Sequence, residues 1–100
     1  MENECCCGKK TKERSPEEYQ KLIHRLNRIE GQIGGLKRMI EKDAYCTDIL
    51  IQSSAAAAAL NAFNKELLAN HIRTCVADGI RGGDDEVIDE LVSIVQRLMK

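Results

Sequence analysis

The chain has 100 residues, and Ala, Leu and Ile supply most of its apolar side chains while only 3% of its residues are aromatic, a composition that favours packed helices over a β-sandwich. No run approaches the roughly 20 apolar residues that span a bilayer, and the N-terminus has no apolar leader, so we expect a cytoplasmic protein without a membrane segment. The formal net charge is −1, but the charges are unevenly distributed. Residues 1–42 hold ten Lys and Arg and seven Asp and Glu, whereas residues 43–100 hold five Lys and Arg and nine Asp and Glu. A polyanion such as DNA would therefore have to bind a local basic face in residues 1–42.

The first predicted helix follows a polar segment, residues 1–14, which we expect to be a mobile tail ahead of a single helical domain over residues 15–100. Ser15 precedes Pro16, and Glu18 stands three positions after the Ser, which is the pattern of a capping box at a helix start. Apolar residues then recur at alternating spacings of four and three, which predicts one buried face on this helix. They are Leu22, Leu26, Ile29, Ile33, Leu36 and Ile40.

A second, long helix is predicted between Tyr45 and Asp78, because the chain has neither Gly nor Pro there. Asp43 or Thr47 is expected to cap its start, and Gly79 is expected to end it.

A third helix is predicted after a turn at Gly82 and Gly83, with Asp84 as its cap. Its apolar face is formed by Ile88, Leu91, Val95 and Leu98. Three helical patterns predict an all-α fold.

The cysteines and one histidine carry the main chemical signal. Five Cys is an odd number for a secreted disulfide scaffold, so we expect reduced thiols that act as ligands or redox centres. His71 and Cys75 are four residues apart, which places them one turn apart on one face of a helix. Cys46 lies 25 residues before His71 and 29 before Cys75. At about 100° of rotation per residue, both separations place Cys46 within about 20° of the same helix face. Two thiolates and one imidazole fit trigonal Cu(I) better than a structural zinc site, which normally has four ligands.

These three residues cannot share an ion within one continuous helix, because a rise of roughly 1.5 Å per residue separates Cys46 from the other two by about 40 Å. An antiparallel partner helix brings Cys46 of one chain to His71 and Cys75 of another, which predicts a two-fold dimer with two equivalent sites. A short chain buries limited surface alone, which also favours association. From the residues alone, an ordinary role as buried Cys and surface His stays open.

Three segments, RLNRIEGQIGGLKRMIE, AYCTDILIQSSAAAAAL and HIRTCVADGI, resemble the CsoR/RcnR family of bacterial metal- and stress-responsive repressors over nearly the whole chain after residue 15. The resemblance implies a three-helix protomer that forms an antiparallel dimer with a four-helix-bundle core, assembling as a disc-like dimer of dimers. It also implies a repressor that binds operator DNA without a helix-turn-helix. No second acid or base accompanies His71, so we do not expect an enzyme.

Within that family, the pattern of the Cu(I)-sensing branch falls on Cys46, His71 and Cys75. The resemblance therefore implies that Cu(I) releases the repressor from DNA and derepresses copper efflux or buffering genes. Nickel and cobalt sensors use more His, persulfide sensors lack the His, and formaldehyde-responsive members generally lack the second Cys. Two alternatives stay open: a thiol-based repressor that responds to reactive sulfur or formaldehyde through Cys46, and a Cu(I) buffer with no DNA role.

A basic ridge is predicted beside the apolar stripe of the first helix, where cations follow i, i+4, i+7 spacing and continue further along. An ordinary solvated helix face is the alternative, and the family resemblance favours the ridge. Relatives commonly have an Arg where this chain has Gly34, so its DNA affinity or operator preference is expected to differ. The ridge consists of Lys21, Arg25, Arg28, Lys37 and Arg38.

Two further features complete the expectations. By the same resemblance, Tyr45 and Glu90 form the pair that couples copper binding to the DNA-binding state. The adjacent thiols of Cys5, Cys6 and Cys7 are expected either to be incidental to the tail, or to capture Cu(I) loosely, add a ligand to the main site, or crosslink on oxidation.

Overall fold

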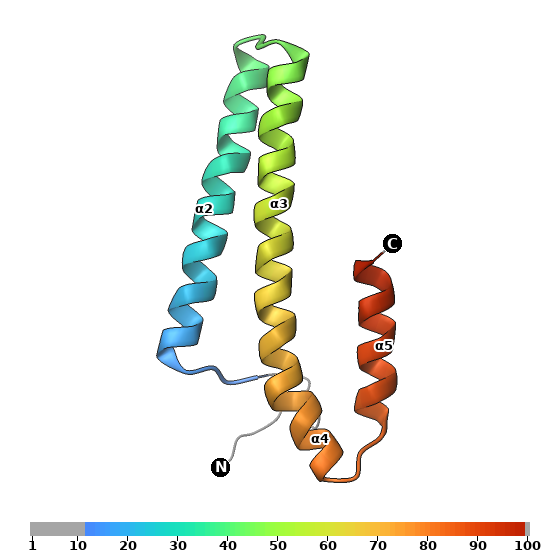
Figure 1. Ribbon diagram of the computed structural model, residues 1–100. Coiled ribbons are helices and arrows are strands. Elements are labelled where there is room, and N and C mark those ends of the chain that lie inside the picture. Colours follow the sequence, from blue (N-terminus) through green and yellow to red (C-terminus); the bar gives the residue numbers. More distant parts are fainter. Residues whose placement is uncertain (1–11, 100) are drawn as a thin grey trace. The chain divides into compact units, whose positions relative to one another are not determined.

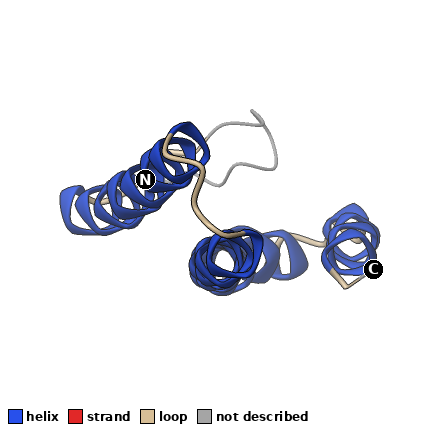
Figure 2. Ribbon diagram, turned by 90° about the horizontal axis from the view of Figure 1, so that it is seen from above, coloured by secondary structure: helices blue, strands red, loops and turns tan. Residues whose placement is uncertain are grey.

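Every regular element among the described residues, 12–99, is a helix in this computed structural model (Figures 1 and 2). The α3, η1 and α4 segments follow one another without a break, and η1 is a π-helix. The described chain therefore has three helical stretches, which confirms the predicted all-α, three-helix protomer. The elements are α2 (Pro16–Glu41), α3 (Cys46–His71), η1 (Ile72–Val76), α4 (Ala77–Arg81) and α5 (Glu86–Leu98).

Two compact units make up the described residues. One is Ser15–Leu67, which contains α2 and most of α3; the other contains residues 68–99 together with tail residues 12–14. Most of the predicted tail, residues 1–11, lies outside the described residues. The division into a tail over residues 1–14 and one domain over residues 15–100 stays a prediction.

Helix α2 begins as its sequence predicts. The Ser15 hydroxyl accepts a hydrogen bond from the Glu18 backbone N–H at 3.1 Å, and Pro16 occupies the first helical position. This arrangement satisfies one N–H that would otherwise lack a partner inside the helix, and it places Pro where its missing N–H is not needed.

The end of α2 corrects one prediction. Asp43 does not cap the next helix, because it has φ 57°, in the left-handed region. The Asp43 N–H donates a hydrogen bond to the Ile40 carbonyl at 3.1 Å, and the Ala44 N–H donates one to the Met39 carbonyl at 2.9 Å. This is a Schellman motif that closes α2. Thr47 does not cap α3 either, because it lies inside that helix.

Helices α2 and α3 run antiparallel within the first unit (Figure 1). Glu66 of α3 forms ion pairs with Lys21 at 3.2 Å and with Arg25 at 3.5 Å. The buried apolar side chains of this unit are few, namely Leu22, Ile29 and Ala56.

The second unit is built on a close approach between α4 and α5. Gly79 is buried, and a Cβ there would lie only 2.7 Å from Cγ1 of Val87. The prediction that Gly79 ends the helix is therefore wrong. Gly79 lies inside α4, and its lack of a side chain leaves space for Val87. The helix ends instead at Arg81, with Gly82 as its C-cap, and Gly83 follows in the left-handed region with φ 83°.

The N-cap of α5 is Asp85 rather than the predicted Asp84, and the Asp85 side chain makes no capping hydrogen bond. Asp84, one residue earlier, accepts a hydrogen bond through its carboxylate from the Glu86 backbone N–H at 3.0 Å. The buried side chain of α5 is Val87. Of the predicted apolar face, Ile88 and Leu98 are exposed.

Apolar side chains remain on the surface of both units. On α2, half of the predicted stripe is exposed, including Ile33 and, at 63%, Ile40. On α5, Val92 is half exposed. Exposed faces of this kind mark surfaces that bind another molecule. No helix within residues 12–99 is long and apolar enough to cross a bilayer.

Candidate metal-binding site

Cys46 is the first residue of α3, and its thiol is both free and exposed. A thiol in this position is open to a ligand or a second protein chain.

His71 and Cys75 lie on either side of the start of the π-helix. His71 is the last residue of α3, and Cys75 is the fourth residue of η1. The Ala77 N–H reaches the Ile72 carbonyl, an i→i+5 hydrogen bond that widens the turn. The angular count along an ideal helix therefore holds from Cys46 to His71 but not through to Cys75. Single π-helical turns are frequently found at functional sites.

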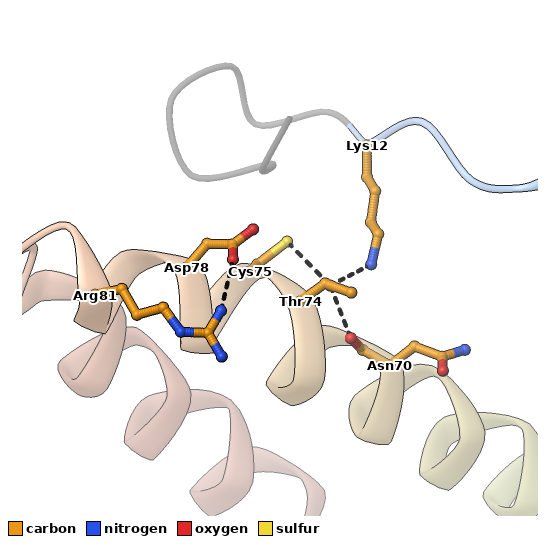
Figure 3. Close-up of polar contacts among 6 residues, drawn as sticks. All are labelled: Lys12, Asn70, Thr74, Cys75, Asp78 and Arg81. Atoms are coloured by element: carbon orange, nitrogen blue, oxygen red, sulfur yellow. Dashed lines mark hydrogen bonds and ion pairs between the residues drawn. The ribbon is translucent and has the colours of Figure 1, made fainter. Parts of the chain in front are cut away.

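The surroundings of Cys75 were not predicted. Its side chain is completely buried, and the Thr74 hydroxyl lies 3.8 Å from its sulfur (Figure 3). The same hydroxyl lies 2.8 Å from the Asn70 carbonyl oxygen, to which it donates, and it accepts a hydrogen bond from the Lys12 ammonium at 2.5 Å. Lys12 and Thr74 are 62 residues apart in sequence, so a local sequence pattern cannot predict this contact.

The oxidation states of the two candidate thiolate ligands differ. Cys75 is disulfide-bonded. Cys46 is free. Cys75 must be reduced before its sulfur can bind a metal as a thiolate.

One protomer does not bring the three candidate ligands together. Cys46 and His71 are the two ends of a 26-residue helix, which is about 39 Å long at 1.5 Å per residue. Among residues 12–99, no group of three His, Cys, Asp or Glu side chains is placed to hold a metal ion. The set of Cys46, His71 and Cys75 therefore stays a prediction that needs a second chain.

The two members of the predicted coupling pair belong to different units. Tyr45, which directly precedes α3, is 72% exposed and belongs to the first unit. Glu90 lies in α5, in the second unit. Their role stays a prediction.

The predicted basic ridge lies on α2, and it contains a feature that sequence reasoning missed. Two of its cations, Lys21 and Arg25, form ion pairs with Glu66, although Lys21 is exposed. The other three, Arg28, Lys37 and Arg38, are also exposed. The pairing depends on how α2 and α3 align, which a single helix pattern does not fix. The ridge is therefore partly neutralised at its N-terminal end.

A family model described as "Metal-sensitive transcriptional repressor" matches residues 18–97. The copper-sensing transcriptional repressor CsoR of Bacillus subtilis is 43% identical to this chain over 88 residues, which cover 87% of each protein. Transcriptional repressors act by binding DNA and are not enzymes, as the sequence predicts.

Two solved structures are also similar. The copper-sensing repressor CsoR with Cu(I) from Geobacillus thermodenitrificans NG80-2 has a TM-score of 0.85 and 41% identity, covering 90% of this chain and 95% of that one. The nickel-responsive transcriptional regulator InrS has a TM-score of 0.72 and 34% identity, covering 85% of this chain and 97% of that one. Sequence and fold agree, and this chain belongs to the family of metal-sensitive transcriptional repressors.

Proposed function

We propose that this chain is a cytoplasmic, copper(I)-responsive repressor that binds operator DNA without metal and releases it when Cu(I) binds, derepressing genes for copper efflux or buffering. The observation that carries the proposal is the donor set of Cys46, His71 and Cys75 in a chain 43% identical to a copper-sensing repressor. Thiolate sulfur is a soft ligand that selects Cu(I), and imidazole suits copper as well.

The donor set fits copper when two chains contribute. Cys46 presents an exposed thiol, and His71 and Cys75 lie one helical turn apart. We assign Cys46 of one protomer and His71 with Cys75 of its antiparallel partner to one site, repeated by two-fold symmetry. Cys46, His71 and Cys75 would hold Cu(I), which would supply coordinate bonds to these three side chains.

The exposed apolar faces support the proposed assembly. A dimer, and a homotetramer formed from two dimers, provides partners for the side chains that α2 and α5 leave in water, such as Ile33, Ile40 and Val92.

The proposed DNA contacts lie on α2, and their effect depends on the conformation that copper favours. Copper lowers DNA affinity only if it binds the weakly DNA-binding conformation more tightly than the other. We assign Tyr45 and Glu90 to this coupling. The DNA-contacting residues are Lys21, Arg25, Arg28, Lys37 and Arg38.

The test is an anaerobic titration of the reduced protein with Cu(I) while its binding to a fluorescent fragment of its own promoter region is followed. We expect release from DNA at about one Cu(I) per protomer, the stoichiometry of two equivalent sites per dimer. His71→Ala should abolish release. His24→Ala removes the other histidine of the chain, on an exposed position of α2, and should leave release intact.

A second candidate is favoured by the exposed, free thiol of Cys46. A thiol-based repressor that responds to reactive sulfur or formaldehyde would respond without Cu(I), and its response would survive Cys75→Ala or His71→Ala. Tight copper binding that leaves DNA binding unchanged would contradict the proposed function and indicate a Cu(I) buffer.

A further inference from the structure

Lys12 is a cation that the fold holds beside the candidate ligand Cys75. Its ammonium donates a hydrogen bond at 2.5 Å to the Thr74 hydroxyl, and that hydroxyl lies 3.8 Å from the Cys75 sulfur (Figure 3). The ammonium nitrogen is therefore within about 6.3 Å of the sulfur, the sum of these two distances. All three residues belong to the second unit. A candidate ligand thus has a positive charge next to it.

The position of Lys12 depends on Thr74 rather than on the oxidation state of Cys75. A hydroxyl has one proton to donate and lone pairs that accept. The Thr74 hydroxyl donates its proton to the Asn70 carbonyl at 2.8 Å, and a lone pair accepts from the Lys12 ammonium. Neither of these two hydrogen bonds uses the sulfur. We therefore expect Lys12 to keep its place when the Cys75 disulfide is reduced.

The other charges close to Cys75 in sequence are arranged differently. Asp78 forms an ion pair with Arg81 at 3.3 Å, so this carboxylate has a cation of its own (Figure 3). Arg73 is exposed and stands two positions before Cys75, which turns it toward about the opposite face of the helical segment. Lys12, in contrast, is linked to the residue next to the sulfur by a hydrogen bond.

The charge of the bound metal ion decides what a neighbouring cation does. Two thiolates and one neutral imidazole together carry two negative charges, so the centre keeps one negative charge with Cu(I) and none with a divalent ion such as Zn(II). A cation stabilises the first centre and not the second. Because both ions bind the same empty site, the interactions of the empty site cancel when the two affinities are compared.

We propose that Lys12, positioned by Thr74, contributes to metal specificity by favouring monovalent Cu(I) over divalent ions. The inference rests on the proposed function, because it takes Cys46, His71 and Cys75 as the ligands. The contact is exposed, so an effective dielectric constant of about 40 to 80 is appropriate. Unit charges roughly 6 Å apart then favour the charged centre by about three- to tenfold.

The ratio of Cu(I) affinity to Zn(II) affinity tests the proposal. The reduced, full-length chain is titrated anaerobically at about 0.01 M salt, where charges are weakly screened. Bicinchoninate competes for Cu(I), and mag-fura-2 competes for Zn(II). Lys12→Gln should lower the ratio about three- to tenfold, whereas Lys12→Arg keeps the charge and should preserve most of it. An unchanged ratio in Lys12→Gln would overturn the proposal.

Salt and a matched charge variant separate this local charge from other causes. The effect of Lys12→Gln should nearly vanish at about 1 M salt, where the screening length is about 3 Å. An effect that persists at high salt would contradict an electrostatic origin. Arg73→Gln removes the same charge from η1 itself and should change the ratio less. Equal shifts in Arg73→Gln and Lys12→Gln would mean that only overall charge matters.

Thr74 variants test how Lys12 is positioned. Thr74→Val removes the hydroxyl and should lower the ratio about as far as Lys12→Gln does, whereas Thr74→Ser keeps a hydroxyl and should leave the ratio high. The double variant Lys12→Gln with Thr74→Val should be no lower than either single variant, because the two residues act through one contact. Additive losses would contradict the positioning role of Thr74.

A measurement without metal tests the contact itself. The reduced, metal-free chain is acetylated briefly, and mass spectrometry compares Lys12 with Lys42, the exposed C-cap of α2, as an internal reference. Lys12 should react several-fold faster in Thr74→Val than in Thr74→Ser, because its amine has lost a hydrogen-bond partner. Equal rates in the two variants would show that the contact is not made in solution.

DNA release is measured separately, so this inference and the proposed function can fail independently. A wild-type chain whose metal preference depends on Lys12, but which keeps its operator DNA when Cu(I) binds, would reject the proposed repressor function and leave this inference standing. Release of DNA by Cu(I), together with a metal preference that Lys12→Gln does not change, would support the proposed function and overturn this inference.

Discussion

Glu66 gives the basic ridge of α2 a counter-charge inside the protein. It contacts Lys21 and Arg25 at once, and its own side chain is only 22% exposed. In the proposed DNA complex, phosphates would therefore compete with a carboxylate for these two cations. A surface ion pair adds roughly 0–1 kcal/mol to stability, so the larger effect of Glu66 is expected on the DNA-binding face.

Glu66→Gln should tighten operator binding and make it more salt-dependent, because two cations become available to phosphates. Each added phosphate contact increases the slope of log K against log salt by about 0.9. Fluorescence anisotropy at several salt concentrations measures both quantities. Asp48→Asn removes the same charge at the other end of α3, and an equal effect of this control would mean that only overall charge matters.

Gly34→Arg should also raise DNA affinity, because it adds a cation to α2, the helix that carries the proposed phosphate contacts. The site accepts a side chain, since a Cβ there would meet only the flexible Arg38 guanidinium, at 3.6 Å. Gly34→Ala improves helix propensity by up to about 1 kcal/mol without adding charge, and it serves as the control. If both variants bind the operator equally, helix stability rather than charge explains the change.

The candidate ligands were identifiable from sequence, but their surroundings were not. The i, i+4 spacing of His71 and Cys75 is a local signal, and it needs only the knowledge that the segment is helical. Glu66 and Lys12 act through contacts 41 or more residues away in sequence, which depend on how separate elements align. A helix pattern carries no information about that alignment.

At the scale of the elements, helix starts were predicted better than helix ends. The side chains of Ser15 and Asp84 accept hydrogen bonds from backbone N–H groups at the starts of α2 and α5, which is a property of nearby sequence. Asp43 ends α2 in a conformation that usually favours Gly, so its role was assigned to the wrong helix. The π-helix η1 also has no signal of its own in the sequence.

Gly79 illustrates that a glycine in a helical segment can either end the helix or allow another element to pack closely against it. Gly79→Ala should destabilise the fold by about 1–3 kcal/mol, because the new Cβ would lie 2.7 Å from Val87 and overpack the contact between α4 and α5. Chemical denaturation at one fixed protein concentration measures the change.

Gly31→Ala is the matched control for that experiment. It lies inside α2 with nothing within 4 Å of the added Cβ, so the same substitution should stabilise the chain by about 0.5–1 kcal/mol. Destabilisation of both variants to the same extent would show that the contact with Val87 is not the cause.

At the scale of the whole molecule, a single chain leaves both its apolar faces and its candidate metal site incomplete. The buried apolar side chains among residues 12–99 are few, and the candidate ligands begin and end one long helix. The proposed assembly would provide partners for both features.

Mixing two inactive variants should restore copper binding if each site spans two chains. Neither Cys46→Ser nor Cys75→Ser alone should form the three-ligand site. In an equal, randomly exchanged mixture, half of the dimers contain one intact site, so about one quarter of a Cu(I) per chain is expected. The readout is tight Cu(I) bound in competition with bicinchoninate, and no gain on mixing would place the site within one chain.

Two of the candidate ligands, Cys46 and His71, are the first and last residues of α3. The number of helical turns between them therefore sets the directions in which their side chains face. When two copies pair antiparallel, both lengthen together, so an insertion keeps the ends opposite each other. One added residue rotates an end by about 100° and turns its ligand away, whereas seven added residues rotate it by only about 20° from its original face. In the proposed dimer, the metal site therefore depends more on the direction in which Cys46 and His71 face than on the number of residues between them.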